Sequence, residues 1–299
     1  MLTGVHFLLS MTCNYECDHC FLYCSPMTRG TFTSEQLFDA FKQMDKIDSI
    51  NSIYFEGGEP FLFYPVLLHG LKLAAQRGYS RGVVTNGYWA NSKKDALLWL
   101  GHLAEVGLDN LSVSDDSLHH GSEQGIRMKW IKQAADELGL SSGAICLEAP
   151  DPDRDDQSVN ERGEPIVGGD IRFRGRAVDK LAKGLPRIDG SDFNQCPDED
   201  FANPGRVHLD PFGNVHLCQG IIMGNIWKTP LEKLIREYDV KSHPICSCLQ
   251  NGGPLKLAKE YGYSSQEGFV DPCHMCYETR KSILDEFPEY LGPAMVYGL

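Results

Sequence analysis

Between residues 4 and 149 the chain alternates short β-rich runs with longer amphipathic segments, and this order constrains the fold more than any other feature. Strands are expected at residues 4–10, 52–60, 81–87, 110–116 and 143–149. Helices are expected between them, at residues 31–47, 64–79, 93–107 and 123–139. Such repetition is typical of parallel strands joined by right-handed crossovers, and it places the chemistry in loops at the carboxyl ends of the strands.

Unusual short motifs fall where four of these expected strands end. The stretch MTCNYECDHCFLYC, residues 11–24, follows the first strand and spaces Cys13, Cys17 and Cys20 as C-x3-C-x2-C. The second, third and fourth strands lead into the motifs GGEP (57–60), TNG (85–87) and SDD (114–116). Because the carboxyl ends of parallel strands share one edge of a sheet, these motifs predict a single composite site.

The regular alternation of expected strands and helices ends after residue 150. Residues 150–170 are polar and contain several Pro, Gly and Asp, so the sequence predicts a loop, a linker or a cover over the site there. Residues 170–177, DIRFRGRA, predict a sixth strand whose Arg172, Arg174 and Arg176 share one face. An inward face would let one of them bind a carboxylate, and an outward face would leave solvated charge. Residues 206–219 predict a β-hairpin that turns at 211–214.

Composition and charge restrict where the chain works and what it binds. The opening residues MLTGVHFLLS have neither a basic segment nor a long apolar run, and no stretch approaches the roughly 18 apolar residues that span a bilayer. A cytoplasmic location is therefore expected, where clustered cysteines are more often metal ligands than disulfides. A net charge of −13 argues against nucleic acid or a membrane surface as a partner.

The first cysteine loop, taken together with the motifs at the next three strand ends, resembles the radical S-adenosylmethionine (SAM) superfamily over about the first 180 residues. In that family three thiolates hold a [4Fe–4S] cluster whose open iron chelates SAM. The resemblance implies that Cys13, Cys17 and Cys20 are the cluster ligands and belong to the catalytic centre. It implies contacts with SAM for His19, Gly57, Gly58, Glu59, Pro60, Asn86, Ser114 and Asp116.

A closed zinc site is the alternative for this loop, because Cys24 offers a fourth thiolate. Four-cysteine ligation would fill the metal coordination and leave no open position. A zinc site leaves the GGEP motif and its position unexplained, so the open iron–sulfur cluster is preferred. Cys24 is then interpreted as a bystander thiol or as a residue near the substrate.

A second set of cysteines lies in the C-terminal part of the chain. The G-x4-C hairpin ending at Cys218, preceded by Cys196, is similar to the SPASM and twitch appendages of radical SAM maturases. That similarity implies one auxiliary [4Fe–4S] cluster on Cys196, Cys218, Cys273 and Cys276. Either Cys246 or Cys248 could replace one of these ligands, and a structural zinc on four of the cysteines is the competing interpretation.

The predicted fold is α/β, a partial (βα)6 TIM-like barrel followed by a small cysteine-rich α+β module. The radical SAM core is expected over residues 1–185 and the SPASM/twitch-like module over residues 186–299. The resemblance implies an oxygen-sensitive enzyme that cleaves SAM reductively to methionine and a 5′-deoxyadenosyl radical, which abstracts hydrogen from its substrate.

The expected partners are that substrate and a reductant such as flavodoxin or ferredoxin. The substrate is a peptide, a protein or a small molecule, and the appendage favours peptide or protein modification. Two other classes keep the cysteines without this chemistry: a non-SAM iron–sulfur electron carrier and a zinc-stabilised binding module.

Overall fold

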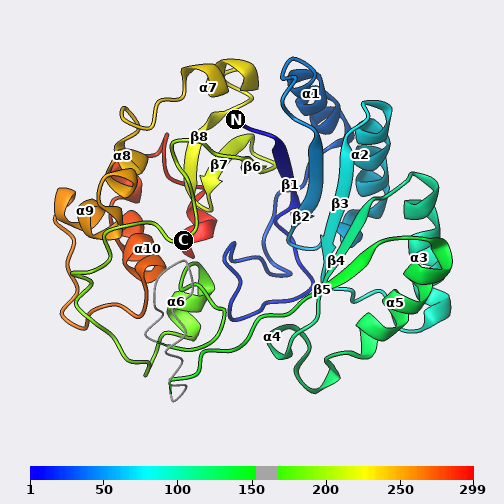
Figure 1. Ribbon diagram of the computed structural model, residues 1–299, viewed down its shortest axis with the longest axis horizontal. Helices are drawn as coiled ribbons and strands as arrows, with labels where there is room; N and C mark the ends of the chain where they lie inside the picture. The colour runs from blue at the N-terminus through cyan, green and yellow to red at the C-terminus, as the bar shows by residue number, and fades with distance from the viewer. Residues whose placement is uncertain (153–166) are drawn as a thin grey trace.

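The computed structural model describes residues 1–152 and 167–299, which are built around one eight-stranded sheet (Figure 1). The strand order is β5-β4-β3-β2-β1-β6-β7-β8. The bounds of the strands are β1 Gly4–Ser10, β2 Ser52–Gly57, β3 Ser80–Thr85, β4 Asn110–Ser114, β5 Ser142–Ile145, β6 Arg206–Leu209, β7 Asn214–Cys218 and β8 Ile221–Asn225. Every pair from β5 to β6 is parallel, and β7 and β8 continue the sheet antiparallel.

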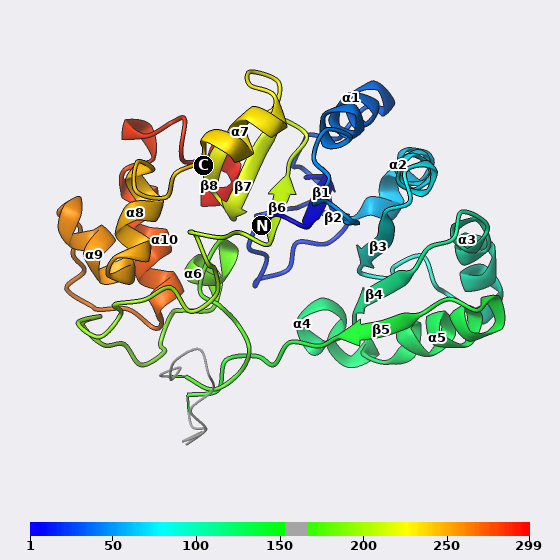
Figure 2. The ribbon, with the colours of Figure 1, turned by 45° about the horizontal axis from the view of Figure 1, so that its top comes forward.

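The crossover helices cover the outer face of the curved sheet, as Figure 2 shows for α1, α2, α3 and α5. Their bounds, with the short helix that precedes α5, are α1 Ser34–Met44, α2 Tyr64–Gln76, α3 Lys93–Glu105, α4 Ser117–His120 and α5 Ile126–Leu138. A capping box fixes the start of α1, since Thr33 and Gln36 each bond the other's backbone N–H. On β1, Phe7 stacks on Phe41 of α1 and on Phe55 of β2, with ring centroids 5.4 and 5.3 Å apart. This apolar layer between sheet and helices leaves the inner face of the sheet for the site.

The strand predicted at residues 170–177 is wrong, because this segment follows the cysteine loop instead of the sheet. The backbone N–H of Arg176 donates to the carbonyl of Cys20 at 2.9 Å. Gly175 has φ +60°, and a Cβ there would lie 2.5 Å from Phe21 Cα, so only glycine allows this close approach. Helix α6, Arg176–Lys180, begins immediately after it.

The sixth parallel strand is β6, which comes from the predicted hairpin and pairs with β1. The hairpin itself is confirmed by the β6–β7 pairing, in which His208 lies opposite His216. The sheet therefore runs across the predicted boundary between residues 185 and 186, and the division into two modules stays a prediction. Most of the loop predicted at 150–170, residues 153–166, lies outside the described part of the chain.

Four helices lie beyond β8, on the side of the sheet away from β5 (Figure 1). They are α7 Leu231–Glu237, α8 Pro244–Gln250, α9 Gly253–Glu260 and α10 Pro272–Ser282. In α10 the side chain of Arg280 is 2% exposed and donates to the carbonyls of Cys276 and Gln219 and to the Tyr297 hydroxyl. Within residues 1–152 and 167–299, no helix is both long enough and apolar enough to cross a membrane.

Candidate active site

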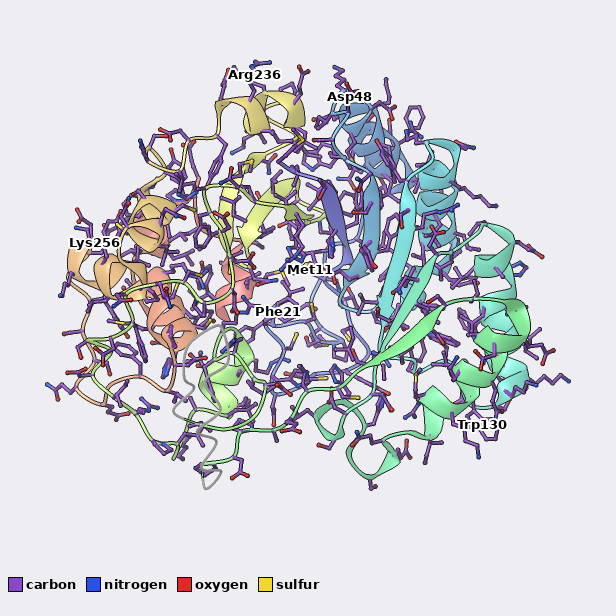
Figure 3. The ribbon with its side chains drawn as sticks, in the orientation of Figure 1. Met11, Phe21, Asp48, Trp130, Arg236 and Lys256 are labelled. Atoms are coloured by element: carbon purple, nitrogen blue, oxygen red, sulfur yellow. The ribbon has the colours of Figure 1, made fainter. Side chains whose placement is uncertain are left out.

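A cavity of about 340 Å³ opens where β1 to β4 end, and the first cysteine loop forms one of its walls. The loop begins after the buried Met11 and passes Phe21 near the middle of the molecule, inside the outer layer of side chains (Figure 3). The cavity-lining residues from the loop are Cys13, Tyr15, Cys17, His19, Cys20, Phe21, Leu22 and Cys24. The structure thus brings together the three predicted cluster ligands and the surplus thiol of Cys24.

Two of the predicted cluster ligands, Cys13 and Cys17, lie in surroundings that do not stabilise a thiolate, and the third, Cys20, is stabilised by its neighbour. Burial, with repulsion from the neighbouring thiolates, raises the pKa of Cys13 and of Cys17 to about 12. Cys24 hydrogen-bonds to Cys20, which lowers the pKa of Cys20 to about 6 and raises the pKa of Cys24. A cationic metal centre would stabilise these thiolates, because the thiolate is the form that binds metal. The donor set therefore fits an iron–sulfur cluster.

The turn after β2 is tied to the cysteine loop through its backbone. Gly58 N–H donates to the carbonyl of Ser10 at 2.6 Å, and Glu59 N–H donates to that of Thr12 at 3.0 Å. Gly57 has φ +123°, and a Cβ on Gly58 would lie 2.1 Å from the Thr12 carbonyl oxygen. Both glycines line the cavity. The GG pair therefore lets two backbones meet at the place where SAM is predicted to bind.

Glu59 and Pro60 lie behind the cavity wall, although the sequence predicts SAM contacts for both. The Glu59 carboxylate is fully buried and accepts from the N–H groups of Phe61 and Asn86 and from the Thr85 hydroxyl. Burial raises its pKa to about 7 against the lowering effect of these hydrogen bonds. Glu59 is thus a support that joins the second and third strand ends. Its contact with SAM stays a prediction.

The third and fourth strand ends place Asn86 and Ser114 on the cavity, and their contacts with SAM stay predictions. The Asn86 side-chain amide donates to the Cys13 sulfur at 3.8 Å and to the Asn14 side chain at 2.9 Å. Asp116 is 2% exposed and does not line the cavity. Its carboxylate caps α4 and holds the His119 ring, with Nδ1 2.9 Å from Oδ1. Asp116 therefore supports the cavity wall through His119 and through Leu147, whose N–H donates to Oδ2 at 3.2 Å.

His19 shows an unsatisfied polar atom at the cavity wall. Its Nδ1 is buried and has no hydrogen-bond partner among the described residues. The ring meets His119 edge-on at 4.5 Å between centroids, and burial lowers the pKa of His19 to about 4. A neutral ring with a free nitrogen fits the predicted place beside a nucleoside.

Tyr15 and Thr85 are among the cavity residues to which the sequence analysis assigned no role of their own. Tyr15 lies between two predicted cluster ligands, and Thr85 begins the TNG motif. Their positions within these two motifs were the sequence signal that could have predicted a place on the cavity.

The three arginines of residues 170–177 have separate partners, although the sequence predicts that they share one face. Arg172 pairs with Asp198, with Nε 3.3 Å from Oδ1. Arg176 donates to the carbonyls of Cys17 and Cys24, at 2.7 and 2.8 Å, and thereby closes the cysteine loop. Arg174 lies over the Phe21 ring and donates to the Cys218 sulfur at 3.4 Å. Arg172 and Arg174 line the cavity.

The four cysteines predicted to bind the auxiliary cluster line a second, smaller cavity of about 20 Å³. They are Cys196, Cys218, Cys273 and Cys276. Burial raises the pKa of the Cys196 thiol to about 12, and the Cys218 thiolate adds to this effect. The guanidinium groups of Arg174 and Arg280 also line this cavity and would offset thiolate charge. Cys246 and Cys248 do not line it.

The chain was compared with known proteins, and no family model matches it. Over 111 residues, 37% of this chain, it is 28% identical to the putative peptide biosynthesis protein YydG of Bacillus subtilis (strain 168). Over 129 residues, 42% of this chain, it is 27% identical to the S-adenosylmethionine-dependent nucleotide dehydratase of Thermoplasmatales archaeon (strain ISO4-H5). The matches span 35% and 44% of these curated relatives, less than half of either.

Among solved structures, the chain is similar to BtrN in complex with AdoMet and 2-DOIA, with a TM-score of 0.56 at 17% identity. The match covers 86% of this chain and 90% of BtrN. This likeness confirms the predicted α/β partial-barrel fold. Together with the curated relatives, it confirms the predicted resemblance to radical SAM enzymes, and the activity of this chain is a matter for proposal.

Proposed function

We propose that this chain cleaves SAM reductively and abstracts a hydrogen atom from a peptide or protein substrate. The observation that carries the proposal is the convergence of three predicted cluster ligands and the GG turn on one cavity. When bound, the [4Fe–4S] cluster and SAM supply the 5′-deoxyadenosyl radical, and the protein supplies binding, orientation and exclusion of water. Cys13, Cys17 and Cys20 hold the cluster.

The residues around these thiols divide into those that face SAM and those that hold them in place. Gly57, Gly58, Asn86 and Ser114 face the cavity and are the proposed contacts, with His19 beside the nucleoside. Glu59 Oε2 accepts a hydrogen bond from the backbone N–H of Asn86 at 2.8 Å. This bond positions the end of the third strand against the end of the second. Such support matters because small misplacements of reacting groups reduce rates strongly.

An auxiliary [4Fe–4S] cluster on Cys196, Cys218, Cys273 and Cys276 is the second part of the proposal. All four thiols line one cavity, and burial holds the pKa of Cys273 well above its usual value. Bound iron would stabilise the four thiolates, and Arg174 and Arg280 would balance their charge. Zinc could bind the same donor set, so the metal must be identified by analysis.

A peptide or protein is the preferred substrate because the relative YydG is named for peptide biosynthesis. The match to a nucleotide dehydratase supports a nucleotide as the second candidate. Transfer of label separates the two. A deuterated peptide mixture and deuterated nucleoside triphosphates are incubated separately with the enzyme and SAM, and 5′-deoxyadenosine is analysed by mass spectrometry. Deuterium in the product identifies the class of substrate that loses hydrogen.

The chemistry itself is tested by anaerobic reconstitution, iron and sulfide counting, and incubation with SAM and dithionite. We expect about eight irons per chain, four for each cluster, and formation of 5′-deoxyadenosine. Cys218→Ala should reduce the count to about four while the N-terminal cluster remains. Failure of the wild-type protein to form 5′-deoxyadenosine would refute the radical chemistry. Zinc in place of the second four irons would refute the auxiliary cluster.

A further inference from the structure

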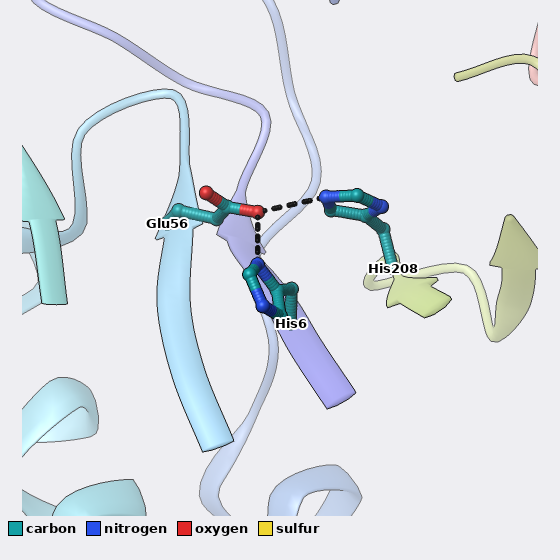
Figure 4. A group of neighbouring side chains, drawn as sticks. All are labelled: His6, Glu56 and His208. Atoms are coloured by element: carbon teal, nitrogen blue, oxygen red, sulfur yellow. Dashed lines mark hydrogen bonds and ion pairs between the residues drawn. The ribbon is translucent and has the colours of Figure 1, made fainter. Parts of the chain in front are cut away.

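His6, Glu56 and His208 form a cluster inside the barrel that the proposed function does not use (Figure 4). They come from β1, β2 and β6, which are neighbours in the sheet. His6 is the register partner of His208, while Glu56 pairs with Leu8, two residues further along β1. Because alternate residues of a strand share a face, all three side chains lie on the inner face.

The three side chains are close enough to share one ion. Glu56 Oε1 lies 3.1 Å from His6 Nδ1 and 3.0 Å from His208 Nε2. One ligand atom from each residue can be chosen so that all lie within 4.8 Å of one another. The His6 ring stacks on Tyr54 at 4.8 Å between centroids, which fixes its orientation. The cluster is thus already arranged by rigid strands.

Protonation also suits metal ligation. Burial would raise the pKa of Glu56, but the hydrogen bonds from His208 and His6 outweigh it and hold this pKa well below its usual range. Burial lowers the pKa of His208, which favours the neutral imidazole. Without a metal, the hydrogen bond to Glu56 Oε1 at 3.0 Å places a proton on His208 Nε2. Because Nδ1 has no hydrogen-bond partner in the described part of the chain, the proton can move to Nδ1 when a cation takes the place of that hydrogen bond at Nε2.

The charge of Glu56 has no permanent counterion in residues 1–152 and 167–299. Both of its ionic contacts there are to histidines, and neither a lysine nor an arginine pairs with it. Both contacts also use Oε1, and the described residues donate no hydrogen bond to Oε2. A buried carboxylate is stable when it is paired or when it coordinates a metal.

We propose that His6, Glu56 and His208 bind one divalent transition-metal ion, with zinc as the preferred ion. Two imidazoles and one carboxylate form a ligand set suited to zinc and to ferrous iron, and three protein ligands leave a position open. Glu56 directly precedes Gly57, and both line the large cavity. The ion would therefore lie at the floor of that cavity and would tie β2, β1 and β6 together.

The test counts zinc in the reconstituted holoenzyme, in which iron occupies the cluster cysteines. The protein is dialysed anaerobically against micromolar zinc and analysed by mass spectrometry. Wild type should retain one zinc more per chain than Glu56→Gln and His208→Gln. His102→Gln, which removes an exposed histidine beside Glu105, should retain the wild-type amount. Zinc held by spare thiols would be the same in all four proteins, so the difference reports this site alone.

A second measurement guards against misfolded variants. Glu56→Gln keeps an acceptor for both histidines, and circular dichroism and the iron count should match wild type. Zinc should raise the thermal midpoint of wild type and of His102→Gln by several degrees and leave Glu56→Gln unchanged. Equal zinc in folded wild type and Glu56→Gln, or no zinc in wild type, would show a hydrogen-bonded triad without metal. Neither outcome depends on SAM cleavage, so the proposed function is tested separately.

Discussion

Replacing Gly58 by alanine should break the contact between the GG turn and the cysteine loop. The new Cβ would lie 2.1 Å from the Thr12 carbonyl oxygen, 2.5 Å from its carbon and 3.0 Å from Cys13 N. Ordinary contact needs more than 3 Å, so the loop backbone must move by about 1 Å. Overpacking of this kind costs about 1–3 kcal/mol, and the bond from Glu59 N–H to Thr12 adds about 1 kcal/mol if it is lost.

The moved backbone carries Cys13, so the change should also reach the cluster. A shift of about 1 Å in a positioned group can lower a rate roughly a hundredfold. We therefore expect Gly58→Ala to unfold at lower urea concentration, to hold less iron and to form 5′-deoxyadenosine about a hundredfold more slowly.

Gly101→Ala is the matched control, because Gly101 lies in α3 with no heavy atom within 4 Å of its added Cβ. Alanine there should stabilise the protein by about 0.5–1 kcal/mol and leave the iron content unchanged. A Gly58→Ala protein with wild-type urea midpoint and rate would refute this reasoning.

Four further changes test the cysteines of the first site and the residues that support the two sites. Cys20→Ala should abolish SAM cleavage. Cys24→Ala should keep the N-terminal cluster, which iron counting would show. Loss of that cluster in Cys24→Ala would contradict the ligand assignment. Arg280→Met should lower the free energy of unfolding by on the order of 3 kcal/mol in urea, because the carbonyls of Cys276 and Gln219 lose their donor. Glu59 has its pKa raised from 4.5 to about 7, so its ionised form destabilises the SAM-free fold. Stability should fall between about pH 4.5 and 7, and Glu59→Gln should flatten this fall in urea midpoints; an unchanged slope would contradict the burial effect.

The parallel half of the fold follows from the sequence because its signals are local. Each predicted strand from residue 4 to residue 149 corresponds to one of β1 to β5, and each motif lies at a strand end. Cys13, Cys17 and Cys20 share a wall because one short loop carries them. Gly57 and Gly58 join them because parallel strands end at one edge.

The remaining features depend on contacts between distant segments, which periodicity does not reveal. Pairing of β6 with β1 joins residues about 200 positions apart, and nothing in the hairpin sequence identifies that neighbour. The same pairing brings His208 to His6 and Glu56, so the sequence alone could not predict that these three residues form a cluster. Burial of Glu59 and Asp116 was missed for a related reason: a motif predicts where a carboxylate lies, and its hydrogen-bond donors decide where it points.

Arg174 lines the large cavity, although the strand predicted to carry it is absent from the described residues. The predicted strand left open whether Arg174 faces inward or outward, whereas the structure turns it inward because Gly175 and Arg176 follow the cysteine loop. Among the described residues it alone lines both cavities. Burial would lower its pKa, but the thiolates of Cys218 and Cys273 outweigh that effect and hold this pKa above its usual range. A permanent positive charge therefore lies between the two cysteine sites, and a change of charge at either site acts on the same guanidinium.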